Sequence, residues 1–215
     1  AMWGMTTTVT SNGSVNSMHD SQTPLSGMMQ MLNMQINCWF GGVGVGWMNY
    51  FAFLVIAVFI SGLMVGRTPE FLGRKVEARE MKIATLVVLL HPFLILVGTG
   101  ISAAVAAANP EIGWLNNPSF HGLSEMLYEY TSSAPNNGSG FEGLADNTPC
   151  WNISTGIALI MGRYFPIVGQ VAIAGLLASK KCIPESAGTL RTDTGTFSLM
   201  TFALALGPIA DYLTF

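Results

Sequence analysis

The charges of this chain are confined to short connectors, and the stretches between them are long enough to cross a lipid bilayer. Of the 215 residues, nine are basic and twelve are acidic, so charged residues make up 10% of the chain. Half of all residues are apolar. Soluble domains carry about 25% charged residues. Eight of the charges lie in residues 67–82, whereas residues 21–66 contain none. The composition indicates an integral membrane protein and excludes a disordered or nucleic-acid-binding chain.

Four apolar segments are candidates for spanning helices, because a bilayer core about 30 Å thick needs about 20 apolar residues as helix. Helix is the only open-chain structure that satisfies the backbone in lipid. Pro166 predicts a break or kink in the third segment, and Gly207-Pro208 interrupts the last, which is weaker and shorter. The segments are residues 38–66, 83–108, 151–179 and 196–213.

The basic residues predict the orientation of these helices, since short cytoplasmic loops are enriched in lysine and arginine. Five basic residues lie in connector 67–82, and three (Lys180, Lys181, Arg191) in connector 180–195. None lies in residues 83–162. Both connectors are therefore expected on the cytoplasmic side and segment 109–150 on the outer side.

The outer segment has the layout of a re-entrant pore loop. Residues 123–133 form an amphipathic stretch of short-helix length, and a glycine-rich loop follows it before the next spanning helix. Non-helical backbone is tolerated at membrane depth only where protein buries it or water lines it. The sequence thus predicts a half-length helix and a filter loop.

Two loops of the chain are similar at an offset of 125 residues. Asn12-Gly13-Ser14 recurs as Asn137-Gly138-Ser139, and Thr23-Pro24 recurs as Thr148-Pro149. A long apolar segment follows each loop. Transporters and channels are commonly built from such repeats, with the binding site where the repeats meet. We therefore expect two units of loop and helix, the first without its leading helix.

The two loops suit an ion filter in which backbone carbonyls replace the hydration shell, because they combine glycine with small polar residues and contain no carboxylate. Two simpler interpretations stay open: Asn-Gly-Ser is also a glycosylation sequon and a common turn sequence. The predicted potassium-binding residues are Ser11, Asn12, Gly13, Ser14, Asn137, Gly138, Ser139 and Gly140.

Two arginines are candidates for the ion pathway or its gate. Arg163 lies inside an apolar segment, where charged residues are costly and commonly functional. We expect it to face a water-filled path beneath the filter; a helix break with the arginine on a carbonyl is the alternative. Arg67 ends the first long segment and could gate the exit, although arginines at helix ends commonly snorkel.

The sequence contains no catalytic constellation. Asp193-Thr194-Gly195-Thr196 lacks the lysine of a P-type phosphorylation motif, and the glycines from Gly42 to Gly46 lack the strand and acidic partner of a dinucleotide loop. We interpret Gly42 and Gly46 as small residues that, in the manner of a GxxxG motif, let the helix approach the pore loop closely. The chain is expected to be non-catalytic and to bind no nucleotide.

Long motifs of the chain resemble one known family. The potassium-binding A subunit of the Kdp-type potassium-transporting ATPase carries similar sequences over nearly the whole length. The motifs are Thr10-Ser11-Asn12-Gly13-Ser14-Val15-Asn16-Ser17-Met18-His19-Asp20, Gly41-Gly42-Val43-Gly44-Val45-Gly46, Gly66-Arg67-Thr68-Pro69-Glu70, Glu77-Ala78-Arg79-Glu80-Met81-Lys82, Ser124-Glu125-Met126-Leu127-Tyr128-Glu129-Tyr130-Thr131-Ser132 and Asn136-Asn137-Gly138-Ser139-Gly140-Phe141.

The resemblance implies an all-α integral membrane fold of four helix, pore-loop and helix units, like the Trk and Ktr transporters. Residues 1–66 would hold the third repeat's pore loop and exit helix. Residues 83–179 would hold the fourth repeat, with a broken exit helix, and residues 196–215 a terminal helix. Two of four filter strands cannot close a pore, so the resemblance implies a fragment of a working subunit.

The resemblance also implies the chain's ion and its partners. Potassium would be the bound ion. A P-type catalytic subunit would hydrolyse ATP, small accessory membrane subunits would complete the complex, and the location would be the bacterial plasma (inner) membrane with the filter outside. Two rivals stay open: a passive Trk/Ktr-type potassium channel or symporter subunit, and a membrane scaffold whose loops are structural turns.

Overall fold

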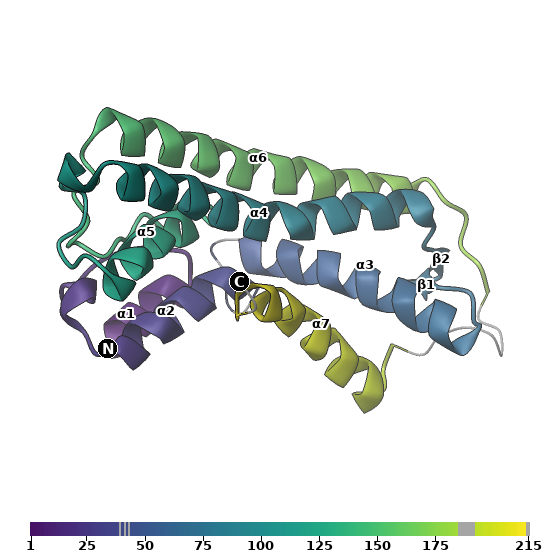
Figure 1. The fold of residues 1–215 in the computed structure, drawn as a ribbon. Helices are drawn as coiled ribbons and strands as arrows, with labels where there is room; N and C mark the ends of the chain where they lie inside the picture. The colour runs from purple at the N-terminus through teal and green to yellow at the C-terminus, as the bar shows by residue number, and fades with distance from the viewer. Residues whose placement is uncertain (39, 41, 43, 185–191, 214–215) are drawn as a thin grey trace.

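The computed structural model describes the chain except for residues 39, 41, 43, 185–191 and 214–215, and gives the backbone alone for residues 65 and 205–213. Gly41, Val43 and Arg191, on which parts of the sequence interpretation rest, lie outside the described residues. Helices make up almost all the regular structure (Figure 1). The elements are α1 (Met2–Val9), η1 (His19–Ser21), α2 (Pro24–Ile36), α3 (Val45–Val65), β1 (Glu70–Phe71), β2 (Arg74–Lys75), α4 (Ala78–Ala108), η2 (Pro110–Ile112), α5 (Phe120–Ser133), α6 (Pro149–Ala178) and α7 (Gly195–Leu213).

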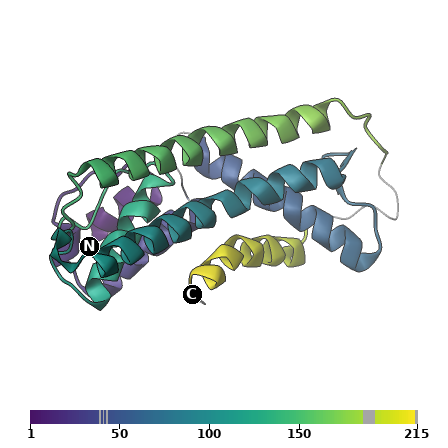
Figure 2. The ribbon, with the colours of Figure 1, turned by 45° about the horizontal axis from the view of Figure 1, so that its top comes forward.

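Three helices of the described residues are long and apolar enough to cross a membrane. They are α3 over Val45–Met64, α4 over Ala78–Ala108 and α6 over Pro149–Ala178. Helices α4 and α6 run side by side, with α3 packed against both (Figures 1 and 2). Part of the predicted fourth span, 196–213, lies outside the residues whose side chains are described; within them, α7 is an apolar helix over Gly195–Leu204. Helix α7 packs against α2, α3 and α4.

The prediction of a broken exit helix at Pro166 is wrong. Helix α6 is continuous from Pro149 to Ala178 with Pro166 inside it. A long apolar helix tolerates one missing backbone N–H when neighbouring helices pack along it. Helix α4 packs along α6 in this way. Helix α7 likewise continues through Gly207-Pro208.

An interruption lies in the first unit, where residues 38–66 were expected to span the membrane with a tilt or a break. Helix α2 ends at Asn37, which adopts a left-handed conformation with φ 46°, and α3 begins after Gly44, with φ 82°. Gly42 therefore precedes the helix instead of sharing a helix face with Gly46, so the GxxxG pairing is wrong, whereas the expected close approach to the first loop is found. A Cβ on Gly42 would contact the carbonyl oxygen of Thr10 at 3.6 Å, so this segment lies against the first loop.

Helix α5 lies in the interior of the end of the molecule that carries α1 and α2 (Figure 1). It packs against α2, α4 and α6, and side chains on all its sides are buried, among them Glu125, Met126, Tyr128 and Tyr130. A half-length helix cannot span a bilayer, and this one is enclosed by longer helices instead. Its burial positions the loop that follows it.

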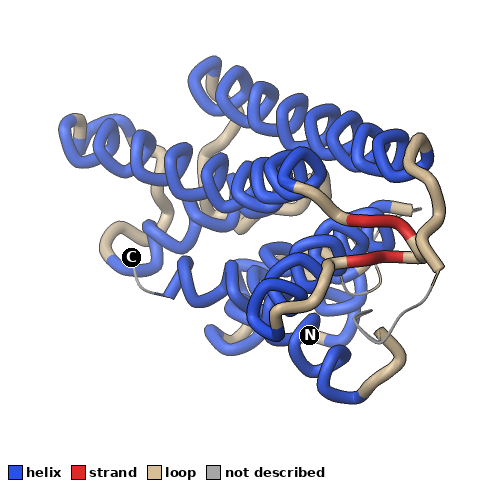
Figure 3. The backbone as a smooth tube through the Cα atoms, turned by 90° about the vertical axis from the view of Figure 1, so that its right-hand side faces the viewer, coloured by secondary structure: helices blue, strands red, loops and turns tan. Residues whose placement is uncertain are grey.

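The two basic connectors meet at the opposite end of the molecule. Lys180 Nζ, after α6, lies 3.0 Å from a Glu77 carboxylate oxygen and 2.9 Å from one of Glu80. Connector 67–82 is not a simple loop: it forms the antiparallel β1–β2 hairpin (Figure 3). A capping box of Glu77 and Glu80 starts α4 at Ala78, five residues before the predicted 83.

Candidate functional site

The two predicted filter loops lie in contact, backbone against backbone. A Cβ built on Gly13 would stand 1.8 Å from the carbonyl oxygen of Asn137 and 3.1 Å from the amide nitrogen of Ser139. The Asn137 Nδ2 donates a buried hydrogen bond to the carbonyl oxygen of Thr8 at 2.9 Å. Neither loop is helical between Asn12 and Ser14 or between Asn137 and Gly140.

The loops share one backbone conformation at the offset of 125 residues. Ser11 and Asn136 have positive φ values of 55° and 67°, and Gly13 and Gly138 have 79° and 81°. The hydrogen bonds that end the preceding helices also correspond. They run from Asn12 N to Thr7 O and from Ser11 N to Thr8 O, and from Asn137 N to Ser132 O and from Asn136 N to Ser133 O. Helix α1, which the sequence analysis did not predict, therefore precedes the first loop in the same way as α5 precedes the second.

Backbone carbonyls in both loops are available as ligands. Within the described chain no hydrogen bond ends on the carbonyl oxygens of Ser11, Asn12 or Gly13, or on those of residues 137–140. Ser14 differs, because Trp3 Nε1 donates to its carbonyl oxygen at 3.1 Å. Among these residues Asn12 and Gly138 are exposed, while the others are buried or half-buried, where carbonyl groups normally have a partner. A run of open carbonyls on two touching loops is the arrangement that a cation can use.

The side chains of the loops are occupied in holding the backbone. Ser14 N donates to Asn12 Oδ1 at 3.0 Å, and the hydroxyls of Ser14 and Thr7 lie 3.2 Å apart. Ser11 Oγ donates to Asn37 Oδ1 at 3.3 Å, which ties the first loop to the interruption between α2 and α3. These contacts leave the main chain, together with the buried Asn137 Oδ1, which has no hydrogen-bond partner among the described residues, as the surface that a bound ion would meet.

A buried tyrosine connects the second loop to the first unit. The Tyr128 hydroxyl lies 3.2 Å from Ser139 Oγ, 3.1 Å from His19 Nδ1 and 3.4 Å from Gln30 Oε1. Burial raises the pKa of the Tyr128 hydroxyl and lowers the pKa of His19, so both groups are neutral near pH 7. The Tyr128 ring stacks on Phe141 with centroids 4.3 Å apart.

An acidic side chain lies behind the second loop. A Cβ on Gly140 would stand 3.0 Å from a carboxylate oxygen of Glu129. Burial, and then the negative charge of Asp146, raise the pKa of Glu129 to about 7. The loops themselves hold no carboxylate, so Glu129 is an acidic group directly adjacent to the predicted filter residues.

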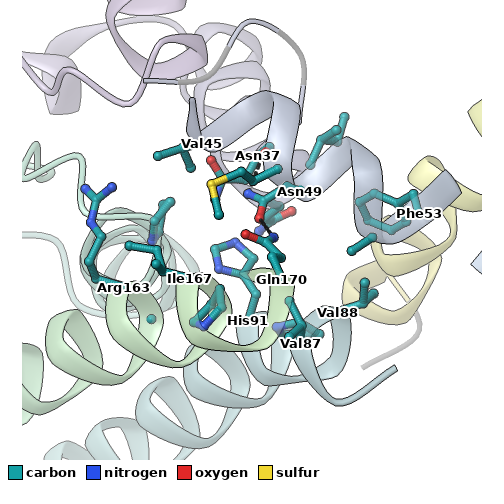
Figure 4. A pocket seen from close by; sticks show the side chains of 18 residues that line it. Asn37, Val45, Asn49, Phe53, Val87, Val88, His91, Arg163, Ile167 and Gln170 are labelled. Carbon is teal, nitrogen blue, oxygen red and sulfur yellow. Dashed lines mark hydrogen bonds between the residues drawn. The ribbon is translucent and has the colours of Figure 1, made fainter. Parts of the chain in front are cut away.

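A mainly apolar cavity of about 60 Å³ that also exposes a few polar side chains lies between α3, α4 and α6, bordered by Pro135 of the second loop and Asn37 (Figure 4). This volume holds several water molecules. Gln170 Nε2 donates to Asn49 Oδ1 at 2.8 Å, and Asn49 Nδ2 donates to the carbonyl oxygen of Asn37 at 2.8 Å. His91 lines the same space. Amides and an imidazole among apolar helices make a path that water or an ion could enter.

The two candidate arginines lie in different places. Arg163 lines the cavity, and its guanidinium points away from His91 and Gln170 (Figure 4). Arg67 is exposed and follows the C-cap Gly66 of α3, at the end of the molecule remote from the loops (Figure 1). The structure brings Arg163, and not Arg67, near the loops.

Comparison with known proteins gives the family of this chain. A family model described as the potassium-transporting ATPase A subunit matches residues 1–215, the whole sequence. The chain belongs to the potassium-transporting ATPase A subunit family. With three apolar helices in the described residues, this member of the A subunit family is a membrane protein.

The matches to relatives of this A subunit family member cover all or nearly all of the chain. Proteins named potassium-transporting ATPase potassium-binding subunit are 76% identical in Phocaeicola vulgatus and 69% identical in Parabacteroides distasonis, each over 100% of the chain. The Geobacillus kaustophilus protein of that name is 51% identical over 97% of the chain. The chain spans 41% of the length of the first two relatives and 39% of the third.

Several parts of the site were not predicted from the sequence of this A subunit family member. His19, Tyr128 and Gln30 are far apart in the chain, and no motif indicates that they meet. The cavity residues Asn49 and Gln170 are single polar residues within apolar helices, which is the signal that could have found them.

Proposed function

We propose that this chain is part of the potassium-binding and translocating membrane subunit of an ATP-driven potassium uptake pump. The observation that carries the proposal is the contact between Gly13 and Asn137, which puts two runs of open carbonyl oxygens side by side. The relatives are named potassium-binding subunits, and the proposal extends that name to these loops.

Carbonyl oxygens suit potassium for a physical reason. A weakly hydrated monovalent cation exchanges its water for several neutral oxygen dipoles at little net cost, and it leaves again because no full negative charge holds it. We assign this role to Ser11, Asn12, Gly13 and Ser14 of the first loop and to Asn137, Gly138, Ser139 and Gly140 of the second. Ser14 contributes less, since Trp3 shares its carbonyl oxygen.

Two loops surround only part of an ion, so we propose that two further units complete the filter. The shared φ values and hydrogen bonds of the two loops support a repeated unit of helix and filter loop. In this proposal the chain holds the last two of four repeats. The exposed side of Asn12 and Gly138 faces the other two repeats.

The energy for uptake comes from a partner in this proposal. We assign ATP hydrolysis to a P-type catalytic subunit and completion of the complex to small accessory membrane subunits. The match to a potassium-transporting ATPase family favours this pump over a passive Trk/Ktr-type channel or symporter. The loops face outside and the basic connectors face the cytoplasm of a bacterial plasma membrane, in keeping with the position of Lys180 and Arg74 at one end of the bundle.

The cavity below the second loop provides the next step of the path. Pro135, Asn49 and Gln170 line it, so an ion leaving the loops would meet amide oxygens there. We propose that Arg163 sets the cation barrier at its edge. A gating role for Arg67 receives less support, because this residue is remote from the cavity.

The substitution Gly138→Asp tests the filter role. A Cβ on Gly138 meets nothing within 4 Å, so the fold has room for the new side chain while a carboxylate enters the filter. We expect loss of potassium-dependent growth and uptake in cells that rely on this pump. The matched control is Gly66→Asp, since Gly66 also has positive φ and open space but lies at the other end of α3. Equal uptake by both variants would contradict the proposal.

A further inference from the structure

A second cluster of ligand-type side chains joins the two units outside the filter loops. Asp20 comes from η1, which follows the first loop, and His121 and Glu125 lie one turn apart on α5. His121 Nε2 is 2.5 Å from Asp20 Oδ1 and 4.0 Å from Glu125 Oε1. One ligand atom from each of the three residues lies within 4.8 Å of the others.

The negative charge of this cluster is poorly compensated. The side chain of Glu125 is 0% exposed and that of Asp20 is 5% exposed. Glu142 adds a third carboxylate, which accepts a hydrogen bond from the Asp20 amide at 3.2 Å. His121 is the single basic partner of Asp20 and Glu125 within the described chain. Buried carboxylates are costly unless they are paired or coordinate a metal.

One oxygen of Glu125 has no hydrogen-bond donor. Glu125 Oε1 accepts from the backbone and side-chain nitrogens of Asn117, both at 3.3 Å. Its other oxygen, Oε2, is buried and has no hydrogen-bond partner among the described residues. Asn117 thus orients the carboxylate, with Oε1 toward His121, in the way that outer hydrogen bonds orient metal ligands. A cation held by both oxygens of this carboxylate would also give Oε2 a partner.

We propose that Asp20, His121 and Glu125 bind a divalent transition metal ion, for which Zn²⁺ is the best match. Imidazole nitrogen and carboxylate oxygen are both ligands of Zn²⁺, and three protein ligands leave a fourth position open to water. His121 is 43% exposed, so water reaches that position. Potassium and magnesium prefer sites made only of oxygen, and the imidazole argues against them.

The geometry needs only small shifts to accept the ion. Ligands at about 2.1 Å from a tetrahedral Zn²⁺ lie about 3.4 Å from one another. The 2.5 Å contact between His121 and Asp20 would open and the 4.0 Å contact with Glu125 would close, each by less than about 1 Å. Asp20 and Glu125, whose ligand atoms lie within 4.8 Å, would close by at most about 1.4 Å. The His121 ring is stacked on Phe141 with centroids 5.7 Å apart, which holds the imidazole in place. The metal would clamp the segment after the first loop to the helix that carries the second.

Metal titration of the complete subunit tests the proposal. The protein is purified in detergent without a polyhistidine tag, treated with chelator and titrated with ZnCl₂ in a calorimeter. We expect one site whose affinity falls at least tenfold in Asp20→Asn and in His121→Gln, and a Zn²⁺-dependent rise in melting temperature that both variants lack. The control Glu111→Gln changes another outer-side carboxylate, which is exposed and outside the cluster. It should bind Zn²⁺ as the unsubstituted protein does.

Unchanged affinity in both cluster variants, or no binding by the unsubstituted protein, would overturn the proposal. Should the variants not fold, electron paramagnetic resonance of Cu²⁺ bound to the unsubstituted subunit reports the ligands directly. One imidazole nitrogen supports the site, and a spectrum without nitrogen coupling refutes it. The proposal does not depend on potassium selection, so its failure would leave the filter proposal unaffected.

Discussion

Gly13 and Asn137 touch through their backbones, so closely that any side chain at position 13 would overlap the Asn137 carbonyl oxygen. Gly13 also has a φ of 79°, which side chains disfavour. Two independent constraints therefore require glycine at this position. At Gly138, with φ 81° and open space, only the second applies.

The comparison of Gly13→Ala with Gly138→Ala tests this contact. The left-handed conformation costs each variant about 1–2 kcal/mol. Gly13→Ala adds the overlap with Asn137, for a total of about 3 kcal/mol or more. Thermal unfolding of the complete subunit in detergent should show the larger fall for Gly13→Ala, together with the larger loss of potassium binding. Equal falls would show that the two loops do not touch.

The Tyr128 hydroxyl is predicted to support the second loop. Tyr128→Phe leaves Ser139 and His19 without a buried hydrogen-bond partner, at a cost of about 1–3 kcal/mol. Potassium affinity should fall several-fold because Ser139 is in the loop. Tyr130→Phe is the matched control: its hydroxyl bonds Ser102 and Ser154, away from the loops. It should lower stability similarly and leave affinity unchanged in a potassium-binding assay.

Glu129 should make stability depend on pH. Its pKa of about 7 in the fold lies above the ordinary value of 4.5, so the folded state holds its proton more tightly than the unfolded state. The stabilisation is complete below about pH 4.5 and is lost as the pH rises through 7. Glu129→Gln mimics the protonated side chain and should therefore raise stability at pH 8 by about 2 kcal/mol, since partial exposure reduces the full effect.

Melting temperatures of the Glu129→Gln variant at pH 4.5 and pH 8 measure this effect. The variant should equal the unsubstituted protein at the lower pH and exceed it at the higher. Asp146→Asn should produce a smaller gain at pH 8, because the charge of Asp146 is the second cause of the shift after burial. The same difference at both pH values would contradict the assignment.

Arg74 should matter for stability and not for ion binding. Its Nη1 donates to the carbonyl oxygens of Leu177 at 2.6 Å and Lys180 at 3.0 Å, and also to that of Ala178, at the C-terminus of α6. A cation there satisfies carbonyls that the helix leaves open. Arg74→Ala should cost about 1–2 kcal/mol. The neighbouring control Lys75→Ala removes only an exposed ion pair with Glu77, at 3.9 Å, and should cost little.

Sequence patterns predicted the long helices well where they continue without interruption. Helix α6 was expected over 151–179 and runs over Pro149–Ala178, and the expected helix 123–133 begins only three residues earlier, at Phe120. Apolar length decides such elements. The break predicted at Pro166 does not occur, because a proline in a packed helix loses only one hydrogen bond. A break was also allowed in segment 38–66, and there Asn37 ends α2 and Gly44 precedes α3, both in left-handed conformations.

The loops could be located from the sequence because Asn-Gly-Ser recurs at a fixed offset. Their surroundings could not. The contacts of Tyr128, Glu129 and Asp20 are with residues more than ten positions away or in the other unit. Such contacts follow from the packing of α5. Local patterns carry no information on which distant side chains a buried helix will meet.

The most direct test of the account is the position of Tl⁺, a heavy surrogate for K⁺, in crystals of the complete subunit. Anomalous scattering locates the ion without assumptions about the protein. The account predicts a peak in contact with the backbone carbonyl oxygens of both loops, between Gly13 and Gly138. A peak held by side-chain carboxylates, or none near either loop, would contradict it.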